Sequence, residues 1–348
     1  MKMRISIIIP VYNTGEVLNR TIQSILNQSF KDYEILLIDD GSDKLTREIC
    51  KKIVNKDCRV RYYHQINSGL CAARNVGIDI ASGEYIMFVD HDDLFIDDDG
   101  LKKINKLLQK YEVDVLKFDY QYFYAKKKIT RHSEKKINTD FYIASRSEFE
   151  DRYEFLREQH ILTYIWDGIY KRSFIQKNKI KFDTSFYMGG EDIEFLMTVS
   201  SYITRLFYCS SIIYQYNVYD TSTYNSADYN KLKRHLTNLK KIIEKEKRII
   251  NSFANVNAER IYKSKIKEIN VFLGFIASKS ILLNYSQIKE LLRKSRSSCS
   301  LTLDEYCKGS KYYSIKKRVL FYLYINNNAV MLAIMLKIYS LKKYFMGR

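Results

Sequence analysis

The chain contains little of what builds linkers, disulfide frameworks and thiolate metal sites. Its 348 residues include one proline and 12 glycines, which argues against a linker-rich or disordered chain. The six cysteines form no Cys-x-x-Cys pair and no cluster, which disfavours a metal site built from thiolates. No signal peptide is recognisable at the N-terminus, so these thiols are expected to be reduced in a cytoplasm. The remaining composition, 46% hydrophobic and 28% charged, is that of a globular chain with one large or two smaller domains.

Acidic residues are scarce in the last third of the chain. Residues 231–348 hold 26 Lys and Arg against 7 Asp and Glu, whereas residues 1–230 hold 32 against 33. This change in charge predicts a boundary near residue 225, with one domain over 1–225 and a basic, helical region over 226–348. A basic module can face nucleic acid, an anionic membrane or simply water.

No apolar run reaches the length that spans a bilayer, which is about 20 residues. The nearest candidates are two apolar pieces at 319–325 and 329–336, and basic residues flank both of them. Basic flanks suit an amphipathic segment that lies at an anionic membrane surface. The alternative is a helical cap whose apolar face packs on the neighbouring domain.

Continuous apolar runs and helical periods alternate through the first part of the chain. Uninterrupted hydrophobicity is typical of strands that are buried on both faces of a sheet. The alternation predicts an α/β fold, with a mostly parallel sheet flanked by helices and followed by an α-helical C-terminal domain. The expected strands lie at 4–10, 33–38, 60–63, 84–89, 113–118, 205–208 and 212–216, with a β excursion at 119–145. The expected helices lie at 16–28, 44–55, 69–81, 98–110 and 147–158, and a further helix is expected to follow the glycine pair at 189–190 and to end at about residue 201.

Acidic side chains follow the ends of two expected strands. Asp39 and Asp40 follow the second strand, and Asp90, Asp92 and Asp93 follow the fourth. In parallel sheets the ligand crevice lies beyond the carboxyl ends of the strands, so these acids should converge on one edge. Carboxylates this close repel one another unless a cation lies among them, which favours a metal–nucleotide site. For the acidic run of the fourth strand alone, a solvated polar turn is the alternative.

Five short segments of the chain occur in a familiar order. They are SIIIPVYN at 6–13, IDDGSD at 38–43, NSGLCAARNVG at 67–77, DHDD at 90–93 and GEDIEF at 190–195. Together they resemble the family 2 glycosyltransferases of GT-A fold, over roughly residues 1–220. A dinucleotide oxidoreductase, the rival for this α/β pattern, would show a Gly-x-Gly-x-x-Gly turn after the first strand, which the chain lacks.

The resemblance implies a donor site for a nucleotide-diphosphate sugar, usually a UDP-sugar. Tyr12 would lie against the uracil as a stacking surface. Asp40 would accept a hydrogen bond from the uracil N3–H. Arg74 would lie near the base or the diphosphate, and its alternative role is a salt bridge that holds its helix to the acidic edge. The nucleotide-sugar-binding residues implied are Pro10, Tyr12, Asp40, Arg74, Asp90 and Asp92.

Within the acidic run, Asp90 and Asp92 match the Asp-x-Asp of the family. One of these carboxylates would contact the ribose. Asp92 or Asp93 would hold Mn²⁺ or Mg²⁺, which bridges the diphosphate and offsets the charge on the departing UDP. Two departures stand out: His91 lies where the family more often has a small residue, and the strand around 214–216 lacks the histidine common nearby, which puts a third metal ligand in doubt.

The resemblance also implies a catalytic pair at the acceptor side. Asp192 would be the base that takes the proton of an acceptor hydroxyl, with Glu191 orienting the acceptor or Asp192. Attack from the face opposite the leaving UDP would invert the anomeric configuration. The alternative is that both acids are simply favoured by a helix N-terminus. An ionised polyprenyl phosphate needs no base, so the pair favours a saccharide hydroxyl, although transfer to a polyprenyl phosphate stays open.

The expected partners follow from both parts of the chain. The basic C-terminal region suggests a lipid-linked saccharide acceptor at the inner face of the cell membrane, in cell-surface polysaccharide synthesis by a peripheral, cytoplasmic enzyme. Nucleic acid is not expected, because the acids of the front part would repel phosphate. The contrasting hypothesis is a non-catalytic, membrane-docked scaffold, and the intact Asp40, Asp92 and Asp192 argue against it. Formation of homo-oligomers is left open.

Overall fold

The computed structural model describes residues 4–186, 189–219, 229–256 and 283–296, together with ten single positions between 272 and 336. The chain divides into two compact units, and each is described by itself. The first unit comprises residues 1–187 and 191–222, and the second comprises 188–190 and 223–348. Of the two apolar pieces expected near the C-terminus, 319–325 lies mostly outside the described residues and 329–336 lies partly outside them.

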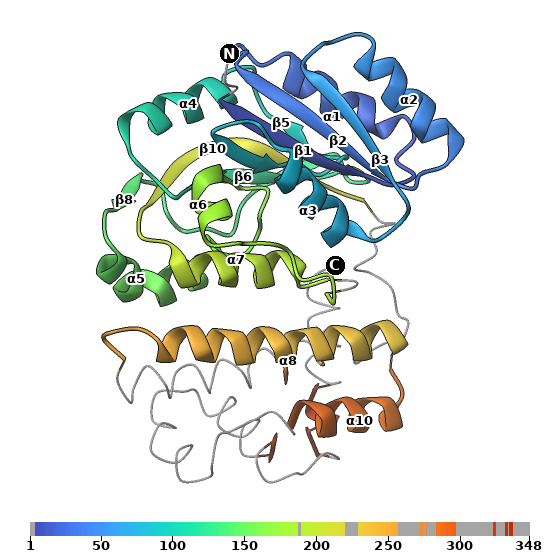
Figure 1. Ribbon diagram of the computed structural model, residues 1–348. Coiled ribbons are helices and arrows are strands. Elements are labelled where there is room, and N and C mark those ends of the chain that lie inside the picture. Colours follow the sequence, from blue (N-terminus) through green and yellow to red (C-terminus); the bar gives the residue numbers. More distant parts are fainter. Residues whose placement is uncertain are drawn as a thin grey trace. The chain divides into compact units, whose positions relative to one another are not determined.

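A ten-stranded mixed sheet forms the centre of the first unit. Its strands are β1 (Ile5–Val11), β2 (Tyr33–Asp40), β3 (Val60–Gln65), β4 (Tyr85–Phe88), β5 (Leu94–Phe95), β6 (Val115–Tyr124), β7 (Ile129–His132), β8 (Phe141–Ile143), β9 (Gly168–Lys171) and β10 (Leu206–Val218). They are ordered β3-β2-β1-β4-β9-β6-β10-β5, and β7 and β8 pair at the sides with β6 and β10 (Figure 1). Strands β3, β2, β1 and β4 are parallel, and β6 and β10 share their direction because β9 is antiparallel to both β4 and β6. The prediction of a mostly parallel α/β sheet is confirmed.

Helices cover both faces of this sheet, which explains the continuous apolar runs. Every residue of β1 and β2 is buried. On one face, Ile7 and Ile9 of β1 share a core with Leu18 and Ile22 of α1, and α2 and α4 contribute to the same core. Figure 1 shows α3, α6 and α7 on the other face. The helices of this unit are α1 (Val17–Leu26), α2 (Lys44–Val54), α3 (Leu70–Ile80), α4 (Gly100–Lys110), α5 (Arg146–Glu158), α6 (Arg172–Lys177) and α7 (Glu191–Tyr202).

Close approach of α3 to the sheet depends on a glycine. A Cβ atom on Gly77 would lie 2.4 Å from the side chain of Ile8 in β1, which is far inside van der Waals contact. The missing side chain therefore lets α3 lie directly on the sheet. This close packing places Arg74, one turn earlier on α3, beside the carboxyl end of β4.

One long strand replaces two expected short ones. The sequence predicts separate strands at 205–208 and 212–216, but β10 runs through both as 13 residues. Its pairing with β6 shifts register between Cys209 and Ile212 and again between Ile212 and Tyr214, so bulges bridge the polar Ser210 and Ser211. At a bulge the alternation of inward and outward side chains is interrupted. The sequence therefore suggests two strands where the backbone forms one. The bulged strand carries Tyr214 to the acidic run after β4.

The described part of the second unit is helical. Helix α8 (Tyr229–Asn251) packs on α10 (Tyr285–Arg296) through a core that includes Leu232 and Leu236 of α8 and Ile288 of α10. Glu290 joins the two helices by an ion pair with Lys233 at 2.8 Å. No helix within the described residues combines the length and the apolar character needed to cross a bilayer.

Candidate active site

The acidic run after β4 is held by the bulged strand β10. Asp93 is fully buried, and both of its carboxylate oxygens are engaged. Its Oδ2 accepts from the Tyr214 hydroxyl at 2.9 Å, and its Oδ1 accepts from the backbone N–H of Asn217 at 2.8 Å. Burial raises the pKa of the Asp93 carboxyl well above its usual value, and the charges of Asp90 and Asp92 act in the same direction. Asp93 thus anchors the run to the sheet.

Asp92 differs from its neighbour in what surrounds its carboxylate. Its backbone carbonyl accepts from the Asn217 side chain at 2.5 Å, which fixes the main chain. Among the described residues, no side chain donates a hydrogen bond to the carboxylate of Asp92, and this residue is half-buried. Burial raises the pKa of Asp92, and the negative charge of Asp90 adds to this effect against the opposing influence of His91. A partly buried carboxylate with free lone pairs is suited to bind a cation.

Arg74 joins the donor-side acids to the expected catalytic pair. Its side chain is almost completely buried, and its guanidinium lies 2.8 Å from Asp192, 3.2 Å from Asp90 and 3.8 Å from Glu191. Burial opposes the charged form, but these three carboxylates outweigh it and raise the pKa of Arg74. A salt bridge between its helix and the acidic edge was one of the two expected roles, and this pairing is present. Contact with a donor stays a prediction for Arg74.

Two polar atoms in this group are buried and have no hydrogen-bond partner in the part of the chain that the structure describes. They are Nε of Arg74 and Oε2 of Glu191. Buried polar groups are normally hydrogen-bonded, so an unpaired donor and an unpaired acceptor on two neighbouring side chains mark a place for a polar ligand or ordered water.

Asp192 stands in the first turn of α7 with its carboxylate facing Arg74. Its side chain is 19% exposed. Burial raises the pKa of Asp192 to about 7; Arg74 and a hydrogen bond from the Ile165 backbone oppose this shift, while Glu191 and Asp90 reinforce it. A carboxyl group whose pKa lies near neutrality can accept a proton at working pH and release it again, which is the property that general-base catalysis requires.

The strand ends of β1 and β2 carry the residues expected to bind the nucleotide. Tyr12 directly follows β1 and is 52% exposed, so one face of its ring is available for stacking. Pro10 lies inside β1, paired with Ile38 of β2. Asp40 is buried, and its carboxylate accepts from the backbone N–H groups of Ser68 and Gly69, each at 2.8 Å. Asp40 therefore orders the loop that leads into α3, and its contact with a base stays a prediction.

Three residues of the site were not found from the sequence. Tyr214 accepts from the backbone N–H of Asp90 at 3.2 Å while its hydroxyl donates to Asp93. Trp166 stacks on the Tyr214 ring with centroids 4.9 Å apart. Ile165 reaches Asp192 only through its backbone, which no sequence pattern reveals. The signal that was available is the single tryptophan, which lies beside a strand rich in tyrosine.

The fold matches that of solved glycosyltransferases. A crystal structure of S. aureus TarS 1–349 superposes with a TM-score of 0.70, over 99% of this chain and 92% of TarS, at 18% identity. The same TarS segment is also known in complex with UDP. The mannosyltransferase PcManGT of Pyrobaculum calidifontis, solved with GDP-Man and Mn²⁺, gives a TM-score of 0.53 over 100% of this chain and 88% of PcManGT, at 14% identity. The first unit is a GT-A fold, as predicted.

Sequence comparison narrows this class to one family. The family model described as glycosyl transferase family 2 matches residues 6–182, and the chain belongs to this family. GlyA, a glycosyltransferase of Streptococcus pneumoniae serotype 4, is 39% identical over 120 residues, which are 34% of this chain and 17% of GlyA. The matches cover 40% to 52% of several other curated relatives, so the chain spans about half or less of their length.

Proposed function

We propose that this chain is an inverting glycosyltransferase that moves a sugar from a UDP-sugar to a hydroxyl of a saccharide acceptor. The observation that carries this proposal is the buried Arg74, which ties Asp90 of the donor-side run to Asp192 of the expected catalytic pair. The guanidinium of Arg74 thereby fixes the distance between Asp90, on the side of the leaving UDP, and Asp192, the proposed base. Family membership supports the reaction class.

The donor proposal rests on the strand ends. An exposed aromatic ring at Tyr12 and a buried carboxylate at Asp40 suit a nucleobase that stacks and donates one N–H. The TarS complexes with UDP and UDP-GlcNAc support a uridine nucleotide. The test is a panel of UDP-, GDP- and dTDP-sugars with Mn²⁺, scored by nucleotide release and by thermal shift of the full chain. Nucleotide release from UDP-sugars alone is expected. If no nucleotide binds at any metal concentration, the proposal that the chain is an enzyme is refuted.

A divalent cation fits the residues present at the acidic run. Among the described residues, no group of three or more His, Cys, Asp or Glu side chains is arranged to hold a metal by itself. Mg²⁺ is commonly held by one or two carboxylates together with substrate phosphates and water, and the open Asp92 carboxylate meets this requirement. We assign Mn²⁺ or Mg²⁺ to Asp92, with Asp93 in the role of anchor. The bound ion would offset the charge that collects on the departing diphosphate.

Asp192 would take the acceptor proton. Its carboxylate faces Arg74, and this cation stabilises the charged form of Asp192 before the reaction. Once Asp192 is protonated, Glu191, 3.8 Å from the same guanidinium, would remain as an anionic partner of Arg74. Because the base and the leaving group act on opposite sides of the anomeric carbon, the product has the inverted configuration.

The activity should therefore depend on pH. Asp192 works as a base only when it is ionised, and burial raises its pKa to about 7. The value of kcat is expected to rise about tenfold per pH unit below pH 7 and to level off above it. Steady-state rates at saturating donor and acceptor from pH 5 to 9 measure this. A flat profile down to pH 5 would favour a polyprenyl phosphate acceptor, which requires no base.

The second unit is proposed to bring the enzyme to a lipid-linked acceptor at the inner face of the membrane. Arg234, Lys241 and Arg248 recur every seven residues on the exposed side of α8, so they form a mainly basic stripe, which also includes Glu244. Such a stripe is attracted to anionic lipid by about 1 kcal/mol per basic residue. Sedimentation with phosphatidylglycerol vesicles is expected at low salt and not with phosphatidylcholine alone. Reversal of all three charges to Glu should abolish it, and sedimentation that persists would contradict this proposal.

A further inference from the structure

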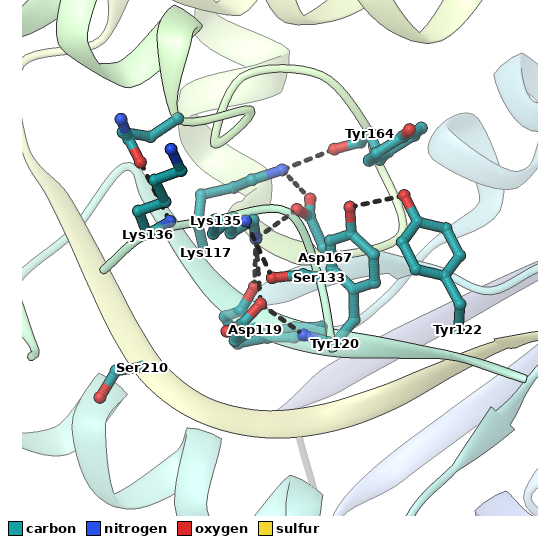
Figure 2. Close-up of polar contacts among 12 residues, drawn as sticks. Lys117, Asp119, Tyr120, Tyr122, Ser133, Lys135, Lys136, Tyr164, Asp167 and Ser210 are labelled. Atoms are coloured by element: carbon teal, nitrogen blue, oxygen red, sulfur yellow. Dashed lines mark hydrogen bonds and ion pairs between the residues drawn. The ribbon is translucent and has the colours of Figure 1, made fainter. Parts of the chain in front are cut away.

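A buried cluster of charges lies beside the active site and takes no part in the chemistry proposed above. Lys117 of β6, Lys135 of the segment after β7, and Asp167 just before β9 have side chains that are 0% exposed. Figure 2 shows both lysines directed at the one carboxylate. Lys117 pairs with Oδ1 of Asp167, and Lys135 donates to Oδ2 at 2.9 Å. Two cations that share one buried anion form an unusual arrangement for a core.

Each ammonium group of the cluster also donates to a backbone carbonyl. Lys117 also donates to the carbonyl of Tyr164 at 2.6 Å, and Lys135 donates to the carbonyl of Phe118 at 2.8 Å. Asp119, 4.0 Å from Lys135, supplies a second negative charge. Burial lowers the pKa of Lys117 to about 8, with Asp167 opposing the shift. Apolar residues of similar volume often replace buried ion pairs without loss of stability, so stability alone does not account for these lysines.

The backbone is adapted to the cluster at Gly168. A Cβ atom at this position would lie 2.8 Å from the aliphatic chain of Lys117. The absence of a side chain leaves room for the Lys117 chain, whose ammonium group reaches both Tyr164 and Asp167. Lys117 therefore donates hydrogen bonds to both ends of the four-residue segment 164–167.

The segment 164–167 contacts both the acceptor side and the donor side of the active site. From its middle, the Ile165 backbone donates a hydrogen bond to Asp192. The next residue, Trp166, stacks on Tyr214 at 4.9 Å and an interplanar angle of 16°. Tyr214 in turn holds Asp93 by its hydroxyl. The same four residues thus touch the proposed base on one side and the anchor of the metal-binding run on the other.

We propose that Lys117, Asp167 and Lys135 form a positioning clamp that fixes the segment 164–167, and through it the distance between Asp192 and the acidic run. The inference rests on the proposed function, because the groups it positions are those assigned to catalysis there. The three residues do not touch substrate. Reacting groups displaced by about 1 Å can lose about 10²-fold in rate, so a loosened clamp should lower turnover without lowering donor affinity.

The test compares Lys117→Met and Lys135→Met with Lys136→Met in the full chain. Methionine keeps most of the volume, and each cluster variant leaves Asp167 one ammonium partner. Lys136 is exposed and next to Lys135, so it is the matched control. We expect kcat to fall 10- to 100-fold in the two cluster variants, with the donor KM changed less than threefold. The acid limb of the kcat profile should move to higher pH, because Asp192 loses the Ile165 hydrogen bond that favours its charged form.

The only tryptophan provides a readout that is independent of turnover. Trp166 is 2% exposed, so acrylamide should quench its fluorescence poorly in the wild type and in Lys136→Met. Quenching should increase in both cluster variants when UDP is absent. Cluster variants with wild-type kcat, pH profile and quenching would overturn the proposal, as would variants that fail to fold at all, since the cluster would then be structural. A wild type that turns over no nucleotide sugar would refute the proposed function and leave the quenching comparison intact.

Discussion

Replacing Asp192 with asparagine is expected to lower kcat by about 10²- to 10⁴-fold, the usual contribution of a general base. Asparagine retains the shape of the side chain, and its one oxygen can still accept from Arg74, so α7 should keep its position beside α3. What it loses is the ability to take a proton. Donor KM should change less than threefold, because Tyr12 and Asp40, which are expected to hold the base, lie at the ends of β1 and β2 and not on α7. Steady-state kinetics at pH 8, where the wild type is largely ionised, measure both constants.

The control for this change is the isosteric substitution next to it. Glu191→Gln also removes one negative charge beside Arg74, at 3.8 Å rather than 2.8 Å. If charge near the guanidinium were all that mattered, the two variants would be equally impaired. We expect Glu191→Gln to lose less than tenfold in kcat and to keep the rise of activity with pH. An Asp192→Asn enzyme that retains a third or more of wild-type kcat would remove Asp192 from the role of base.

The parts of the site that the sequence predicted are those fixed by local rules. A strand buried on both faces has an uninterrupted apolar pattern, and the end of such a strand is visible as the first polar residue. The sequence alone therefore places Asp40 and Asp90 at one edge of the sheet. The helix that begins at Glu191 was expected for a similar reason, since a glycine pair precedes it.

The parts that the sequence did not predict depend on contacts between distant segments. Arg74 and Asp192 are 118 positions apart, and their pairing requires α3 and α7 to lie on the same face of the sheet. The path of β10 depends on its register with β6, which has two shifts that no local pattern records. The buried Lys117 and Lys135 read as ordinary polar residues in the sequence, because a lysine in a core cannot be distinguished from one on a surface until its partner is known.

Asp92 and Asp93 show the same limit at a single site, and they give the second prediction. In the sequence they are equivalent acids after one strand, and either could hold the metal. In the structure, both oxygens of Asp93 are engaged by β10, whereas the carboxylate of Asp92 has no side-chain donor among the described residues. We therefore expect Asp92→Asn to lose about 10³-fold in Mn²⁺-dependent nucleotide release, which corresponds to about 4 kcal/mol of electrostatic stabilisation. Calorimetric titration of UDP with Mn²⁺ or with EDTA should no longer differ in this variant, and its unfolding free energy should stay within about 0.5 kcal/mol of wild type.

Asp93→Asn should give the opposite pattern, because its role is to anchor the chain. The Tyr214 hydroxyl already accepts the backbone N–H of Asp90, so its own proton requires an acceptor on Asp93. An asparagine has one oxygen for two donors, the Tyr214 hydroxyl and the Asn217 backbone, and one of them is left unpaired in a buried place. Urea denaturation should show a loss of about 1–3 kcal/mol in unfolding free energy, while Mn²⁺ still tightens UDP binding. If Asp93→Asn instead lost the response to Mn²⁺ and Asp92→Asn kept it, the ion would belong to Asp93, and the hydrogen bonds from β10 would have to break for it to bind.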